Sequence, residues 1–275
     1  MKRMEQVMHV DTGCRAEKVD VSRQPGHWVL AALGKRVLRP GGLELTEQLI
    51  EGLSPNAEDD VVEFAPGLGV TAQMVLNRNP RSYIGIERES KVAGQLANRF
   101  AAANTRFLNA SAEATCLEDG CAGVVYGEAM LSMQTPEQKR RILTEAFRIL
   151  RPGGRYGIHE LALTPNDVED RVRKAIEREM SLNIHVGVRP LTTSEWRKSL
   201  EKAGFRVTWE QRAPMHLLEP RRVIADEGIM GAARMVFNLL RKPAARRRVL
   251  SMRAMFRRYS SQLSAVALVA VKPAE

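Results

Sequence analysis

The fold of this chain is decided by the stretch Val61-Val62-Glu63-Phe64-Ala65-Pro66-Gly67-Leu68-Gly69-Val70-Thr71-Ala72. Apolar β-branched residues lead into Glu63, two glycines follow, and an apolar-periodic segment begins at Val70. The pattern predicts a strand, a tight glycine turn and the start of a helix. Glycine lacks a Cβ and tolerates positive φ, so Gly67 and Gly69 let a nucleotide-like ligand approach the backbone closely.

A second predicted strand, residues 82–86, leads into Glu87, twenty residues after Gly67. A carboxylate at that position can accept hydrogen bonds from both hydroxyls of a ribose. Glu63 lies just before the glycine turn, where its charge would face the ligand. That charge is unfavourable beside a pyrophosphate and favourable beside a sulfonium or an amino group. The two acids together predict a Rossmann-like domain that holds an adenosine.

Residues 67–72 also fit the dinucleotide fingerprint G-x-G-x-x-A, which is a weak motif when it stands alone. That fingerprint usually opens a dinucleotide-binding fold, whereas here it follows some sixty residues that contain helical segments. The chain also ends in an apolar strand, residues 264–271, after a long helical insert. These features and Glu63 argue against NAD, and a nicotinamide-dependent dehydrogenase remains an alternative.

The glycine loop and four further segments resemble the class I S-adenosylmethionine (SAM)-dependent methyltransferases. The resemblance is nearest to the small-molecule branch that includes the quinone-biosynthesis and sterol methyltransferases. The matching segments follow the family order from residue 60 to 272: the E/D-x-G-x-G-x-G loop at 63–69, the ribose acid Glu87, the adenine-contact loop Ala110-Ser111-Ala112-Glu113, the Pro-Gly-Gly signature and strand at 150–159, and the helix and glycine at 196–205.

This resemblance implies SAM as the cofactor and supplies a set of cofactor-binding residues. The first glycine of the family loop is replaced by Ala65, which suits a negative φ at that position. Ser111 stands where the family most often has Asp, so adenine binding would rely on the Ala112 backbone and on stacking. The implied cofactor-binding residues are Glu63, Ala65, Gly67, Gly69, Glu87, Ser111, Ala112 and Glu128.

Strands and helices alternate along the chain, which is typical of a parallel sheet covered on both faces. Strands are predicted near 60–64, 82–86, 105–109 and 121–126, and a helix over 136–150. The predicted fold is therefore α/β: a Rossmann-like seven-stranded sheet, mostly parallel with the last strand antiparallel, with helices on both faces and helical lid inserts. We expect an N-terminal helical cap over 1–55 and a methyltransferase domain over 56–275, with lid inserts at about 163–194 and 216–263.

Composition agrees with an enzyme-sized domain. The 275 residues, 44% of them hydrophobic, can bury a large core without disulfides or metals. The odd number of cysteines, Cys14, Cys116 and Cys121, suits a reducing compartment and forms no metal-binding spacing with histidine. We expect no metal site. No signal-peptide-like or membrane-spanning segment is evident, so the sequence predicts a cytoplasmic protein.

The second insert carries most of the positive charge. Residues 216–263 hold eleven Lys and Arg and three Asp and Glu, in a chain of net charge +10. Their basic amphipathic pattern fits a solvated helix face, contact with a membrane surface or a lipid-like substrate, or a nucleic-acid footprint. Nucleic acid is disfavoured, because aromatic residues are only 5% of the chain and no RNA-binding module is visible. The oligomeric state is left open.

Methyl transfer from a sulfonium requires that the nucleophile be aligned and, if protonated, relieved of a proton. Groups at strand ends above the cofactor are the candidates. Glu128 follows the fourth strand, His159 and Glu160 end the fifth, and His185 lies in the first lid insert. We predict these four as catalytic or substrate-positioning residues.

The sequence therefore predicts a SAM-dependent methyltransferase that acts on a small, apolar or amphiphilic molecule. Two alternatives remain at this stage. One is a nucleic-acid methyltransferase that uses the basic insert at 216–263. The other is a Rossmann-like protein that binds SAM or a nucleotide without methylating anything.

Overall fold

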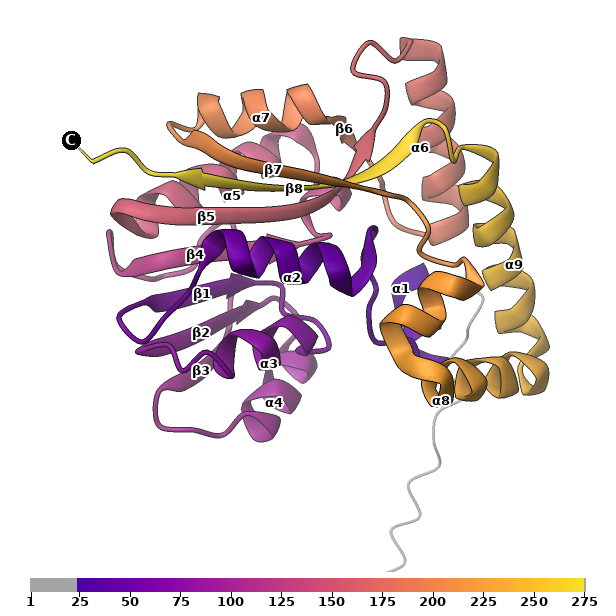
Figure 1. Ribbon diagram of the computed structural model, residues 1–275, viewed down its shortest axis with the longest axis horizontal. Coiled ribbons are helices and arrows are strands. Elements are labelled where there is room, and N and C mark those ends of the chain that lie inside the picture. Colours follow the sequence, from indigo (N-terminus) through magenta and orange to yellow (C-terminus); the bar gives the residue numbers. More distant parts are fainter. Residues whose placement is uncertain (1–23, 275) are drawn as a thin grey trace, which may run out of the picture.

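The computed structural model of the protein describes residues 24–274. Residues 1–23 and 275, which include Cys14 and the beginning of the expected N-terminal cap, lie outside the described residues. Within the described part, eight strands form one sheet (Figure 1). Their bounds are β1 Asp60–Phe64, β2 Ser82–Glu87, β3 Thr105–Asn109, β4 Ala122–Glu128, β5 Leu150–Leu163, β6 Leu191–Thr192, β7 Arg206–Pro214 and β8 Leu263–Val271.

The strand order is β3-β2-β1-β4-β5-β8-β7, and the two-residue β6 pairs with β5 outside this path. The strands from β3 to β5 are parallel, whereas β8 runs antiparallel to both β5 and β7. This confirms the predicted Rossmann-like sheet with an antiparallel last strand. The short strand β6 is an eighth strand that the prediction of seven did not include. The order reverses between β1 and β4, which is where an open α/β sheet forms its ligand crevice.

Helices cover both faces of the sheet, as expected. Side chains of α2, α3 and α4 pack on one face, and those of α5 and α7 pack on the other. The helices are α1 Gly26–Ala32, α2 Gly42–Leu53, α3 Val70–Leu76, α4 Ser90–Arg99, the 3₁₀ helix η1 Leu131–Met133, α5 Pro136–Ile149, α6 Asp170–Ile184, α7 Thr193–Lys202, α8 Pro220–Arg241 and α9 Pro243–Arg258.

The start of α5 shows how local sequence sets an element boundary. The Thr135 hydroxyl accepts a hydrogen bond from Gln138 N at 3.2 Å, and the Gln138 side chain accepts one from Thr135 N at 3.1 Å. Pro136 occupies the first helical position, where its missing N–H has no intrahelical partner to lose. The helix ends at Ile149, one residue earlier than predicted, because Leu150 has ψ 135° and already begins β5.

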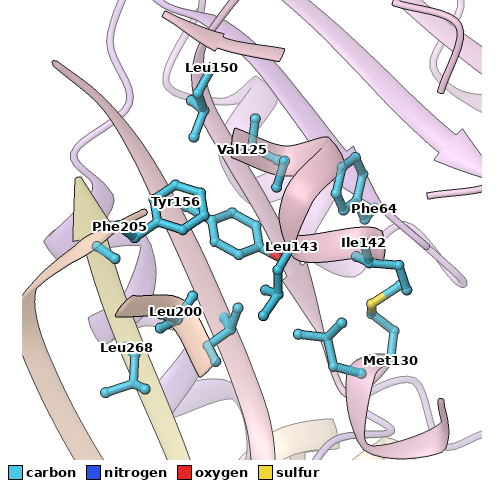
Figure 2. Packing of buried hydrophobic residues seen from close by; sticks show 14 of the residues in the cluster. Phe64, Val125, Met130, Ile142, Leu143, Leu150, Tyr156, Leu200, Phe205 and Leu268 are labelled. Carbon is cyan, nitrogen blue, oxygen red and sulfur yellow. The ribbon is translucent and has the colours of Figure 1, made fainter. Parts of the chain in front are cut away.

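The core between the sheet and α5 and α7 is packed by aromatic rings (Figure 2). Tyr156 and Phe205 stack with their ring centroids 5.2 Å apart, and Phe147 meets Phe205 edge-on at 5.1 Å. Trp196 is fully buried, and its indole N–H donates to the Leu161 carbonyl at 3.1 Å. This packing holds α7 against β5, the strand that carries two of the predicted catalytic residues.

The two lid inserts form a separate hydrophobic core together with α1. Buried residues of α1, α6, α8 and α9 join into one cluster beside the sheet, and Figure 1 shows these helices gathered at one end of it. The second insert is two helices, with Pro243 at the first position of α9. The division at residue 55 stays a prediction: α2 packs on the sheet, while α1 packs with the lid.

Two adjacent acids tie α8 to the segment between α1 and α2. Asp226 accepts hydrogen bonds from the Lys35 ammonium at 3.2 Å and from Leu43 N at 3.0 Å. Glu227 accepts from the backbone N–H groups of Arg36 and Val37, at 2.7 and 2.9 Å. The Lys35 side chain is fully buried, so its charge depends on these carboxylates.

Among the residues that the structure describes, no helix combines the length and apolarity needed to cross a bilayer.

Replacing Asp226 by Asn should destabilise the protein by about 3 kcal/mol, because the Lys35 ammonium would keep only Glu227, 3.9 Å away, as a counter-charge. Urea unfolding of the purified chain measures this. Glu44→Gln is the matched control, since it breaks an ion pair whose Glu44 side chain is exposed, and it should change stability by less than about 0.5 kcal/mol. Equal losses from both variants would contradict the proposed tether.

Candidate functional site

One cavity of about 560 Å³ lies past the carboxyl ends of β1, β2 and β4. The glycine loop after β1, the end of β2 and the loops after β3 and β4 line one part of it. The lid helices and α1 line the other part. The strand order reverses at this place, so the cavity occupies the crevice expected of the fold.

The glycine loop takes the left-handed conformation at three residues. Ala65 has φ 54°, which contradicts the negative φ expected there; the left-handed region costs an L-residue about 1–2 kcal/mol. Gly67 has φ 55°, lines the cavity, and would meet no atom closer than 3.8 Å if it carried a Cβ. Gly69 has φ 69° and lies outside the lining; a Cβ there would come within 2.7 Å of Leu96 and Phe100 on the α4 side. Gly67 is therefore open to a ligand, whereas Gly69 lets the loop pack on the protein.

Glu63 lines the cavity and is almost completely buried. Its Oε2 atom accepts hydrogen bonds from the hydroxyls of Tyr83 and Tyr126, the latter at 2.7 Å. Burial raises the pKa of Glu63 to about 7, although the two tyrosine hydrogen bonds oppose the rise. The second oxygen has no partner among the described residues. The predicted position beside the ligand therefore agrees with this geometry.

Glu87 ends β2 and also lines the cavity. Its Oε1 accepts a hydrogen bond from Glu89 N at 3.0 Å, which fixes the carboxylate. Oε2 has no hydrogen-bond partner within residues 24–274. After β3, Ser111 and Ala112 line the same cavity, and the Ser111 hydroxyl oxygen accepts from Glu113 N at 3.2 Å. Seven of the eight predicted cofactor-binding residues thus line the cavity, and Gly69 is the exception.

Glu128 is the last residue of β4 and the centre of a buried polar network. Its Oε1 accepts from the Thr46 hydroxyl at 2.6 Å and lies 2.8 Å from His159 Nδ1, and its Oε2 accepts from the Thr71 hydroxyl. The Arg39 Nε atom lies 3.2 Å from Oε1. Burial alone would raise the pKa of Glu128, but Arg39 and these hydrogen bonds outweigh it and hold the pKa at about 2. Such a carboxylate is a fixed charge and a poor proton acceptor.

His159 lies within β5 rather than at its end, because the strand continues to Leu163. It is fully buried, and its Nε2 donates to the Pro40 carbonyl at 2.5 Å. With Nδ1 facing Glu128, both ring nitrogens are engaged by the protein. His159 is not part of the cavity lining, so its geometry is that of a residue that positions Glu128.

Glu160 also lies within β5 and is not among the residues that line the cavity. Its carboxylate accepts hydrogen bonds from the backbone N–H groups of Met130, Leu131 and Ser132, at 2.9, 2.7 and 2.9 Å, and from the Ser132 hydroxyl at 2.6 Å. Burial raises its pKa, and these hydrogen bonds oppose the rise. The structure therefore places Glu160 beneath the loop that follows β4, in contrast to the predicted position over the cofactor.

His185 is the C-terminal cap of α6, with φ 59°. Its side chain is exposed and lies outside the cavity lining. The structure therefore does not bring His185 to the predicted site. Glycine or asparagine commonly fills this left-handed cap position, so a histidine there is not a recognisable cap signal in the sequence.

Arg39 is a cavity residue that the sequence pattern did not single out, because Arg39-Pro40-Gly41-Gly42 reads as a helix stop. Its Nε donates to the Thr46 hydroxyl at 2.5 Å. Its Nη2 is buried and has no hydrogen-bond partner among the described residues. Buried donors are rarely left unpaired, so an acceptor from a ligand is the expected partner. Arg39 follows Lys35 and Arg36 closely in the chain, so no local pattern of the sequence distinguishes it.

The lid half of the cavity is apolar. Leu30, Met180, Val188, Met215, Met252 and Phe256 line it, and each is at least nine-tenths buried. The polar side chains that line the cavity are spread over the other half, on the ends of β1, β2 and β4 and on the loops that follow the strands; Glu63, Glu87 and Ser132 are examples. The cavity therefore joins a polar compartment beside the glycine loop to an apolar chamber under the lid.

Glu63→Gln should change how stability depends on pH. The folded-state pKa of about 7 lies above the ordinary glutamate pKa of 4.5, so the unfolded chain binds fewer protons between these values and stability falls as pH rises. We expect wild-type unfolding free energy to drop by about 1 kcal/mol per pH unit across this window relative to Glu63→Gln. Urea unfolding at pH 5, 6, 7 and 8 measures it, and parallel curves would contradict the raised pKa.

The Methyltransferase domain family matches residues 61–154. An uncharacterized protein of Haemophilus influenzae is 33% identical over 220 residues, which cover 78% of this chain and 86% of that protein. The crystal structure of the [4+2]-cyclase SpnF has a TM-score of 0.66 and 17% identity, over 90% of this chain and 92% of that chain. Geranyl diphosphate methyltransferase in complex with SAM has a TM-score of 0.62 and 15% identity, over 83% and 84%.

The two solved structures share the fold with this chain, and the Haemophilus protein shares its family. The matched methyltransferase domain begins in β1 and ends in β5, so it includes the glycine loop, Glu87 and Glu128. On these findings, the chain belongs to the class I SAM-dependent methyltransferases, whose cofactor is S-adenosylmethionine.

Proposed function

We propose that this protein transfers a methyl group from SAM to a small, apolar or amphiphilic molecule. The observation that carries the proposal is the continuity of the cavity: the glycine loop and the apolar chamber line one space of about 560 Å³. A cofactor methyl group between the two halves would face a substrate held under the lid. Proximity and alignment supply most of the catalysis in such a reaction.

Four features of the polar half fit the cofactor. Gly67 leaves open space beside the loop, and Glu87 Oε2 is available for the ribose hydroxyls. Arg39 Nη2 lacks a partner, and a carboxylate from the methionine part of SAM would provide one. Glu63 would face the cationic part of the ligand, whose charge favours the ionised form of Glu63.

The apolar half supports the substrate class. Its lining of Leu, Met, Val and Phe offers few hydrogen bonds, so a polar or charged group placed inside it would lose hydration without compensation, whereas the apolar part of an amphiphile would not. The structural neighbour geranyl diphosphate methyltransferase acts, by its name, on an amphiphile with an apolar chain. His27 is the histidine on the cavity lining, and burial lowers its pKa, so it is a candidate to accept a proton from the nucleophile.

The proposal is tested by titration calorimetry and a methyl-transfer assay. Micromolar binding of S-adenosylhomocysteine, with no binding of NADH or NADPH, is the expected first result. Radiolabelled SAM should then methylate members of a panel of quinols, isoprenoids and fatty acids, and should leave tRNA and rRNA unlabelled. Labelling of RNA alone would overturn the small-molecule assignment. Cofactor binding without turnover on any substrate would favour a different chemistry on this fold, as the cyclase neighbour illustrates.

Glu87→Ala should weaken S-adenosylhomocysteine binding about 100-fold, because it removes a carboxylate that accepts two ribose hydrogen bonds. Glu87→Gln keeps one acceptor oxygen and should lose about tenfold. Glu201→Ala, an exposed acid on α7, is the control and should bind as wild type does. Unchanged affinity in Glu87→Ala would remove Glu87 from the cofactor site.

A further inference from the structure

The second half of α8 exposes a continuous apolar face. Of the eight large hydrophobic side chains that are exposed within residues 24–274, six belong to α8. Five of these follow Gly228, and their exposed fractions are 77% for Ile229, 83% for Met230, 56% for Val236, 55% for Phe237 and 64% for Leu240. Residues 229, 236 and 240 recur at helical spacing and so share one face.

The other face of the same helix is already used. Met235 is 4% exposed and joins the hydrophobic core of the lid, with Leu239 packed against it. A rotation of α8 about its axis that buried the exposed residues would therefore expose Met235 and Leu239. An exposed row of this kind on one helix differs from single scattered apolar residues and marks an interaction surface.

Basic side chains flank this apolar face where α8 meets α9. Arg241, Lys242, Arg246 and Arg247 are all exposed. The Arg241 guanidinium lies 5.2 Å from the centre of the Phe237 ring, at the edge of the face. Arg246 and Arg247 take part in no ion pair with any described residue. The sequence from 228 to 274 contains no Asp or Glu, so nothing within that segment offsets these charges.

We propose that this surface, defined by Ile229, Met230, Val236, Phe237 and Leu240 with Arg241, Lys242, Arg246 and Arg247, docks on an anionic lipid bilayer. An apolar face enters the boundary between headgroups and acyl chains, and a basic rim is attracted to anionic headgroups. A nucleic acid would match the charges but leave five large apolar side chains without a partner. A second copy would cover the apolar face but bring two basic rims together.

The backbone of α8 suits such docking. Gly228, with φ 72° and ψ 171°, interrupts the helix just after the buried anchors Asp226 and Glu227. The segment before Gly228 is bound to the segment between α1 and α2. The segment after it carries the exposed face and is held on its other side by Met235 and by the hydrogen bond from Asn238 to the Leu33 carbonyl. Under the proposed function, docking would bring the apolar chamber close to the bilayer in which apolar substrates dissolve. The docking itself does not depend on that function.

The test is co-sedimentation of the full chain with vesicles of phosphatidylcholine alone or mixed with phosphatidylglycerol. Wild type should bind the mixed vesicles and bind the neutral vesicles much more weakly. Ile229→Ser/Phe237→Ser/Leu240→Ser and, separately, Arg241→Gln/Lys242→Gln/Arg246→Gln/Arg247→Gln should each lower the partition coefficient by about 100-fold. Leu182→Ser, at an exposed apolar residue of α6, is the matched control and should bind within about twofold of wild type.

S-adenosylhomocysteine calorimetry on each variant verifies that the cofactor half remains folded. If the serine variant bound anionic vesicles as strongly as wild type does, the proposal would be overturned, because charge alone would then explain the binding. No vesicle binding by wild type overturns it as well. In that case, light scattering that shows a dimer converted to a monomer by the serine variant would identify a second copy as the occupant.

Discussion

A carboxylate buried at the end of a parallel sheet must be fully satisfied, and Glu128 meets this requirement by drawing four segments together. Thr46 comes from α2, Thr71 from α3, His159 from β5 and Arg39 from the segment between α1 and α2. Without Glu128, the Thr71 hydroxyl would have no partner among the described residues, and the Arg39 guanidinium would lose the carboxylate beside it. The network therefore fixes how the N-terminal segment meets the sheet, and with it one wall of the cofactor compartment.

Three buried acids at this end of the sheet show how surroundings decide what the same functional group does. Glu63 has two tyrosine hydroxyls and no cation in contact, and its pKa rises to about 7. Glu128 has a guanidinium and an imidazole, and its pKa falls to about 2. Glu160 accepts hydrogen bonds from three successive backbone N–H groups and so holds the loop after β4 in place. Of the three, Glu63 is the one that a ligand's charge would most strongly perturb.

The sequence predicted the parts that local patterns determine. The glycine loop, the end of β2 and helix α5 depend on residues close together in the chain, so their periodicity and turn residues sufficed. The roles of His159 and Glu160 depend on the pairing of β5 with β4 and β8, which places both residues inside a buried strand. The Arg39 contact joins segments 89 residues apart in sequence, and no local pattern encodes it. His185 differs because its chemistry suggested catalysis while its backbone position made it a helix cap.

The lid has a hydrophobic core of its own, so different parts of the protein hold the two halves of the cavity in place. Met180, Met252 and Phe256 are held by packing among α1, α6 and α9, whereas Glu63 and Glu87 are held by the sheet. Because the two cores share few side chains, substitutions in the lid can reshape the apolar chamber without moving the glycine loop. The segment from Lys35 to Thr46 connects the two: Lys35, Arg36 and Leu43 are bound to α8, and Arg39 and Thr46 are bound to Glu128. It is therefore a route by which a change in the lid would reach the cofactor compartment.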